Sequence, residues 1–94
     1  MQVTDVQVKL MNKQKLLKKV LAGSQNVRFD EMVMLAEAFG FRLARVSGSH
    51  PIFVHSGVRE LVNLQNVKGQ AKPFQIRQFL RIVERYNLKL EDEE

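Results

Sequence analysis

The sequence contains no cysteine, only two histidines, and no apolar run near the roughly 18 residues that a membrane span requires. Without cysteine the chain forms neither a disulfide nor a thiolate metal site, which fits a reducing compartment such as the cytoplasm. A metal site would need His50, His55 and scattered carboxylates, so we expect neither a metal nor another cofactor. We also expect no signal peptide and no membrane contact, and therefore a cytoplasmic protein.

Acidic residues are scarce in the middle of the chain. Between Arg42 and Arg85, eight lysines and arginines stand against two acids, Glu60 and Glu84. Four of the ten acids are the last four residues, so the body without them carries fifteen bases against six acids, or +9. Such an excess on a small domain favours a polyanionic partner, usually nucleic acid. The alternative is a soluble basic surface without a ligand.

The 94 residues suffice for one domain with a modest core. Weak alternation over residues 1–10 predicts a loose arm. An amphipathic helix with a lysine-rich outer side should follow from Asn12 to about Leu21, ended by Gly23-Ser24. We divide the chain into this arm and basic helix (residues 1–28), a compact domain (residues 29–90) and an acidic tail (residues 91–94).

The compact domain begins with a second predicted helix. Asp30 or a neighbour should cap it, Gly40 should end it with Phe41 packed back, and its apolar stripe is Met32, Leu35, Ala36 and Phe39. Beyond Gly40 the apolar period falls to about two, which predicts three strands. These are residues 41–46, 52–55 and 61–64, joined by turns at residues 47–49 and 56–57.

Pro73 should begin the last helix, since its missing N–H does no harm there. The stripe expected to be buried is Ile76, Phe79, Leu80, Val83 and Tyr86, and a cationic ridge is formed by Arg77, Arg81 and Arg85. The order of elements predicts an α+β domain in which a three-stranded antiparallel sheet packs against helices, with an extra N-terminal helix.

His50 is the strongest candidate for a functional residue. It follows the turn Ser47-Gly48-Ser49, whose amides and hydroxyls could hold a phosphate oxygen. An imidazole can give or take a proton near neutral pH. Pro51 removes a strand donor, so we expect an edge strand or a bulge here, with His50 at an open edge. The alternative is an exposed histidine near a turn without a function.

His55 lies five residues further, so strand alternation places it on the opposite face from His50. A two-histidine relay is therefore not expected, and we interpret His55 as structural or as a contact to an RNA backbone. We find no Ser/His/Asp constellation, phosphate loop or paired carboxylates, and the link between the first two helices is too long for a helix-turn-helix. Cleavage of a polyanion would depend on one histidine with cationic stabilisation.

Several of these features occur together in one protein family. The helix end Leu35-Ala36-Glu37-Ala38-Phe39-Gly40-Phe41, followed by Gly48-Ser49-His50, Ile52-Phe53 and a closing helix from Pro73 to Tyr86, resembles the HicA (YcfA-like) toxins of bacterial toxin–antitoxin pairs. The resemblance covers roughly residues 29–87. This sequence departs from the family at Pro51, where a histidine or aromatic residue is common, and at Leu64-Gln65-Asn66, where many members have Pro-x-His.

The resemblance implies a fold like a double-stranded-RNA-binding domain and a ribosome-independent ribonuclease that acts on mRNA. It also implies that His50 is essential and that a HicB antitoxin covers the catalytic surface. We therefore predict a metal-independent endoribonuclease, a monomer or weak dimer when free. RNA would be bound by Arg45, Ser47, Gly48, Ser49, Lys68, Lys72 and Arg77. The alternatives are a non-catalytic RNA-binding module and a protein-interaction domain whose cationic face serves an acidic partner.

Overall fold

A computed structural model of the chain describes residues 5–23, 25–48 and 50–91. Its helices are α1 (Asp5–Ala22), α2 (Phe29–Ala38) and α3 (Pro73–Arg85). Its strands are β1 (Arg42–Ser47), β2 (His50–His55), β3 (Val58–Asn63), β4 (Asn66–Val67) and β5 (Gln70–Ala71). Ser49 and the last three residues of the predicted acidic tail lie outside the described residues.

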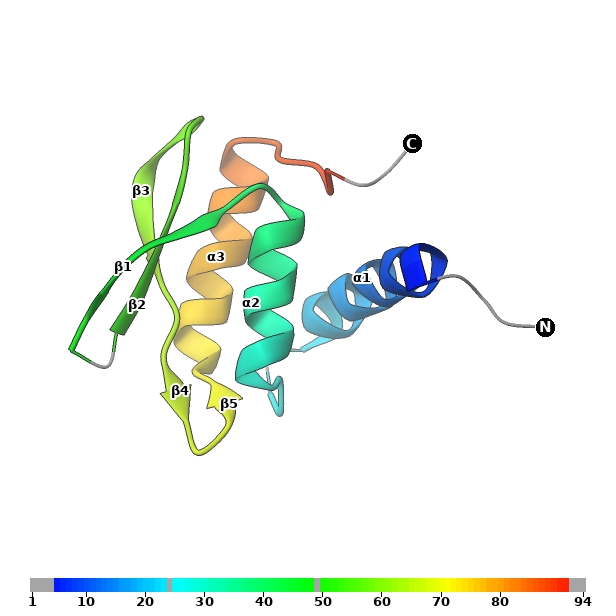
Figure 1. Cartoon of the computed structure of the whole chain (residues 1–94), viewed down its shortest axis with the longest axis horizontal. Coiled ribbons are helices and arrows are strands. Elements are labelled where there is room, and N and C mark those ends of the chain that lie inside the picture. Colours follow the sequence, from blue (N-terminus) through cyan, green and yellow to red (C-terminus); the bar gives the residue numbers. More distant parts are fainter. Residues whose placement is uncertain (1–4, 24, 49, 92–94) are drawn as a thin grey trace.

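The three longer strands form an antiparallel sheet in the order β1-β2-β3. Helices α2 and α3 lie side by side against one face of this sheet, and α1 projects from the opposite side of α2 (Figure 1). The predicted α+β class and three-stranded antiparallel sheet are therefore confirmed. The small hairpin of β4 and β5 was not predicted, and it is held to the start of α2 by hydrogen bonds from Phe29 N to Gly69 O (2.9 Å) and from Ala71 N to Val27 O (2.9 Å).

The core lies between the sheet and the helices, and Phe79 is its centre. Its side chain is 0% exposed, and its ring centroid lies 5.8 Å from that of Phe39 and 5.4 Å from that of Phe41. The predicted stripe of α2 is buried throughout, and Ile76 of α3 is buried as predicted. Leu80, Val83 and Tyr86 are only partly buried, while Ile82, which we did not assign to the stripe, is buried.

Helix α2 ends as the sequence predicts. Gly40 has a φ of +96°, its N–H donates to Glu37 O (2.9 Å), and the N–H of Phe41 donates to Ala36 O (3.0 Å). This is the pattern of hydrogen bonds of a Schellman motif, in which a glycine takes the left-handed conformation at low cost. A Cβ at Gly40 would also clash with Glu91 and lie 3.1 Å from His55 Nε2, so both space and conformation favour glycine.

Several predicted boundaries differ from the structure. Strand β1 is shifted by one residue, to Arg42–Ser47, and β2 begins at His50 and not at Ile52. Helix α1 begins at Asp5, so residues 5–10 are helical and not a loose arm, and Asn12 is not a cap. The segment lacks glycine and proline, and an acid in the first turn favours a helix start, which outweighs weak alternation. Helix α2 is capped at Arg28, whose N–H donates to the Glu31 carboxylate (3.0 Å). Strand β3 begins at Val58, directly after the turn, and ends at Asn63.

The expectation that His50 and Pro51 lie at an open edge is wrong, because β2 is the central strand of the sheet. Pro51 pairs with Val46 of β1, but it lies beyond the last pair of β2 with β3, which joins Ile52 and Asn63. The residue after β3 still contacts it, because the N–H of Leu64 donates to Pro51 O (3.3 Å), so this position uses the carbonyl that proline keeps. The bulge of this region lies in β1, between Leu43 and Arg45.

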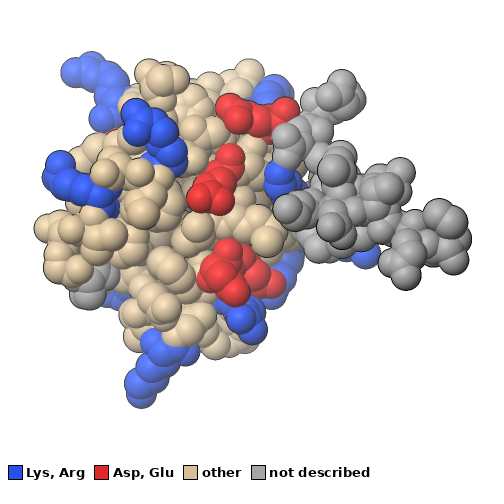
Figure 2. Space-filling view, viewed as in Figure 1, with Lys and Arg blue, Asp and Glu red and all other residues tan. Residues whose placement is uncertain are grey.

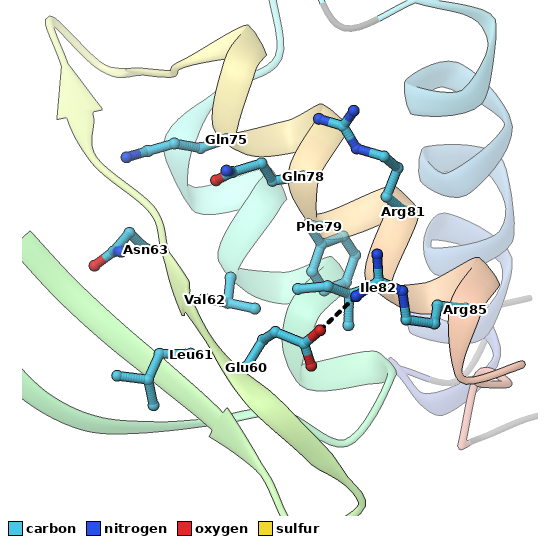
Figure 3. Close-up of a pocket in the computed structure, with 10 residues that line it drawn as sticks. All are labelled: Glu60, Leu61, Val62, Asn63, Gln75, Gln78, Phe79, Arg81, Ile82 and Arg85. Carbon is cyan, nitrogen blue, oxygen red and sulfur yellow. Dashed lines mark hydrogen bonds and ion pairs between the residues drawn. The ribbon is translucent and has the colours of Figure 1, made fainter.

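The far end of β3 is tied to α3 by Glu60. Its carboxylate accepts hydrogen bonds from the Tyr86 hydroxyl (2.6 Å) and from Arg85 Nη1 (2.6 Å). Glu60 and Arg85 border an open groove of about 430 Å³ between β3 and α3 and point into it (Figure 3). The Tyr86 hydrogen bond is the main cause that lowers the pKa of Glu60 below its ordinary value of 4.5, and Arg85 adds to it.

This contact predicts an acid-sensitive part of the stability. Because the pKa of Glu60 is lower in the folded state, its contribution is present above about pH 4.5 and is lost as the pH falls through the folded pKa. Tyr86→Phe should raise that pKa towards the ordinary value, so that the variant's melting temperature falls less than that of the wild type between neutral and acidic pH. Glu60→Gln is the control, because it removes the titrating group. An unchanged pH profile in Tyr86→Phe would contradict the assignment.

Candidate functional site

His50 is the first residue of β2 and is exposed at one end of the sheet. It pairs with Ser47 of β1 across the turn, in which Gly48 has a φ of +64°. The turn therefore needs a residue that tolerates the left-handed conformation, and glycine supplies it. The N-terminus of α3 and the β4–β5 hairpin lie at this same end of the molecule (Figure 1).

Cross-strand partners share a face of a sheet. Phe53 and Val62 pair with each other and belong to the core, so residues one position away face the side without helices. Leu61 and Asn63 point away from α3, whereas Glu60 and Val62 point towards it (Figure 3). We name this side the helix-free face and define it by Arg42, Arg45, Ser47, His50, Ile52, Val54, Arg59, Leu61 and Asn63.

The helix-free face carries three arginines, and no residue in its definition is acidic. Ile52 is buried at its centre, and Leu61 is exposed beside it. In the view of Figure 2, acidic side chains lie over the middle of the molecule, and lysines and arginines lie mostly around the rim. The residues that define the helix-free face include no carboxylate that would repel a phosphate.

His50 contacts Gln65 in the loop after β3, and Gln65 is hydrogen-bonded to Gln75 in the first turn of α3. His50 Nε2 lies 3.4 Å from Gln65 Nε2. The other atom of that amide, Gln65 Oε1, accepts from Gln75 Nε2 (2.9 Å) and from Lys72 Nζ (3.3 Å). Gln75 is 9% exposed and accepts from the backbone N–H of Gln65 through Oε1 (2.7 Å). The imidazole is thus linked through one amide to a buried side chain and to a cation.

The predicted RNA-binding residues fall into two groups. Arg45 and Ser47 share the helix-free face with His50. Lys72 is connected to His50 through Gln65, which contacts both residues. Lys68 lies in the turn between β4 and β5 with a φ of +53°, and Arg77 is exposed on α3. Sequence analysis missed Arg42 and Arg59 on the face, which the period of two in β1 and β3 could have placed there. It named Gln65 only as part of a departure from the family, at Leu64-Gln65-Asn66, and it missed Gln75.

His55 has a structural environment, as predicted. Its Nδ1 accepts a hydrogen bond from the Gly57 N–H (2.9 Å), and its ring centroid lies 5.0 Å from that of Phe41 on the helix side. The two histidines therefore face opposite sides of the sheet, which confirms the expectation from strand alternation. A relay of both imidazoles on one phosphate is not possible in this arrangement.

Within residues 5–23, 25–48 and 50–91, no group of three or more histidine, cysteine or acidic side chains is placed to hold a metal ion. In that same part of the chain, no helix has the length and apolar character needed to cross a membrane. Comparison of the chain with protein-family models, with curated proteins and with solved structures gave no match.

Proposed function

We propose that the chain binds RNA on its helix-free face and cleaves it with His50, as a metal-independent mRNA endoribonuclease of the HicA kind. The observation that carries this proposal is the placement of an exposed imidazole on a sheet face that has three arginines and no acid. A three-stranded antiparallel sheet with helices on one face is compatible with the double-stranded-RNA-binding fold that the resemblance implies. The resemblance also leads us to propose a cytoplasmic location and a HicB-like antitoxin as partner.

The chemistry needs one proton acceptor beside the ribose. His50 takes the proton of the 2′-hydroxyl, the 2′-oxygen bonds to phosphorus, and the bond from phosphorus to the 5′-oxygen breaks. The products are a 2′,3′-cyclic phosphate and a 5′-hydroxyl, whose proton comes from solvent. We assign stabilisation of the charge on the phosphate to Arg45, which shares the face of His50, and to Lys72, which is connected to His50 through Gln65. One acid/base group supplies roughly 10²–10⁴ in rate, so the enzyme should be slow.

A second candidate function is a non-catalytic RNA-binding module. It is favoured by the orientation of His55, which points to Phe41 and Gly57 and so leaves His50 without a second imidazole. In this case the arginines of the helix-free face would recognise phosphates and shape without cleavage. The two functions share the binding surface and differ only in the role of His50.

The proposed surface predicts the salt dependence of RNA binding. Arg42→Ala combined with Arg45→Ala should weaken the binding of a single-stranded RNA, because each lost phosphate contact removes about 0.7 from the slope of log affinity against log salt. The matched control is Lys15→Ala with Lys18→Ala, which removes the same charge from exposed positions of α1. A fluorescence titration at several salt concentrations measures both slopes. Equal slopes for the two double variants would contradict a binding surface on the sheet.

A further inference from the structure

The two histidines meet their hydrogen-bond partners at different ring nitrogens, His55 at Nδ1 and His50 at Nε2. A neutral imidazole carries its proton on one nitrogen and a lone pair on the other, and its hydrogen-bond partners decide which tautomer is present. For His55 the decision is simple. The Gly57 N–H can only donate, and it points at Nδ1 from 2.9 Å, so the proton of His55 is on Nε2.

For His50 the tautomer depends on the orientation of two side-chain amides, those of Gln65 and Gln75. The backbone N–H of Gln65 can only donate, so the atom of Gln75 that meets it at 2.7 Å is the oxygen. The amide nitrogen of Gln75 then lies 2.9 Å from Gln65, where it donates to Oε1. Lys72 Nζ, which also can only donate, approaches the same oxygen at 3.3 Å. Two independent donors therefore fix the orientation of the Gln65 amide.

Its NH₂ group consequently faces His50 Nε2 at 3.4 Å. An amide NH₂ only donates, so Nε2 must present its lone pair and the ring proton must lie on Nδ1. We propose that Gln65 and Gln75 are positioning residues that hold His50 as the Nδ1–H tautomer, opposite to the tautomer of His55. Gln75 is buried, and its amide is held in one orientation. If the amide were turned, its NH₂ group would face the backbone N–H of Gln65, which is also a donor.

The consequence for catalysis rests on the proposed function. The nitrogen at the tip of the ring, Nε2, is the atom that a ribose hydroxyl can reach, and this tautomer makes it the base. The hydrogen bond from Gln65 is long, so a 2′-hydroxyl can replace it when RNA binds. The tautomer itself is independent of whether the protein cleaves RNA.

Nitrogen-15 NMR of the imidazoles tests the tautomers directly, at a pH where both rings are neutral. The wild type should show the proton of His50 on Nδ1 and that of His55 on Nε2, which serves as the internal control. Gln65→Glu keeps the shape of the side chain, and its carboxylate still accepts from Gln75 and Lys72. Its second oxygen needs a donor from His50, so the ring proton should move to Nε2. Gln65→Leu, which removes the donor, should also lose the Nδ1–H form, while His55 stays unchanged in both variants.

A wild-type His50 with its proton on Nε2, or a Nδ1–H form that persists in both variants, would overturn the proposal. Cleavage is measured separately, per RNA bound. If the wild type cleaves, Gln65→Glu should lower kcat by at least about tenfold, towards the roughly 10⁴-fold loss that a wrong tautomer causes in a serine protease triad. Its added negative charge should also weaken RNA affinity, so Gln65→Leu, which adds no charge, is the variant that should lower kcat with affinity little changed. If the wild type does not cleave while the tautomers are as expected, the nuclease proposal fails and the tautomer assignment stands.

Discussion

Phe79→Ala should lower the free energy of unfolding by about 3–5 kcal/mol, the range for a phenylalanine removed from a core. The ring is fully buried and meets two other aromatic rings edge-on or tilted, contacts that add to the loss of buried area. A domain of this size has roughly 5–15 kcal/mol of stability in total, so the loss is a large fraction of it and the variant should melt at a markedly lower temperature. Denaturant unfolding followed by circular dichroism measures the loss.

The same helix offers a matched control. Phe74 is 55% exposed at the start of α3, so Phe74→Ala removes an identical side chain that contributes little buried area. We expect a change within about 0.5 kcal/mol for this variant, as for most surface substitutions. Similar losses in the two variants would mean that the helix presents a different face to the core.

The helical part of this fold was open to prediction because apolar spacing reports directly on which side of a helix is buried. Met32, Leu35 and Phe79 follow that rule, and Gly40 with Phe41 ends α2 through local geometry alone. The start of α1 was predicted wrongly because its residues have no strong pattern of either period. The β4–β5 hairpin was missed because its strands have two residues each, too few for a period.

The order of strands in the sheet is a different kind of information. Pro51 suggested an edge because a ladder normally needs the N–H that proline lacks. The structure places it in the central strand, one residue beyond the last pair with β3, where its carbonyl accepts from the N–H of Leu64. Only the register between β2 and β3 reveals this, and a sequence does not state where a partner strand stops.

Only part of the candidate site could be predicted from the sequence. His50 could be singled out by its turn, and strand alternation separated it correctly from His55. Gln65 and Gln75 could not be found in this way. Gln65 contacts His50, and Gln75 contacts Gln65, only after three segments have packed together: β2, α3 and the loop after β3. Glutamine is common on surfaces, and burial of one amide is what gives this pair its role.

In the proposed site His50 is the one proton acceptor, so it is the residue whose replacement should have the largest effect on activity. His50→Ala should reduce cleavage of bound RNA by roughly 10²–10⁴, because that is what a single acid/base group supplies. Affinity and its salt dependence should change little, since the arginines of the helix-free face remain. In cells, induction of the wild type should stop growth and degrade mRNA, and His50→Ala should do neither.

The second histidine provides the control for this result. His55→Ala removes a ring that packs on Phe41, so it should lower the melting temperature and leave cleavage by the folded protein intact. Cleavage by the wild type should also persist in EDTA, because the chemistry needs only the imidazole and the cations. Two results would make His50 a contact residue. One is growth arrest that is equal for the wild type and His50→Ala. The other is a loss of RNA binding in His50→Ala while cleavage per bound RNA stays the same. The helix-free face would then belong to the non-catalytic RNA-binding module.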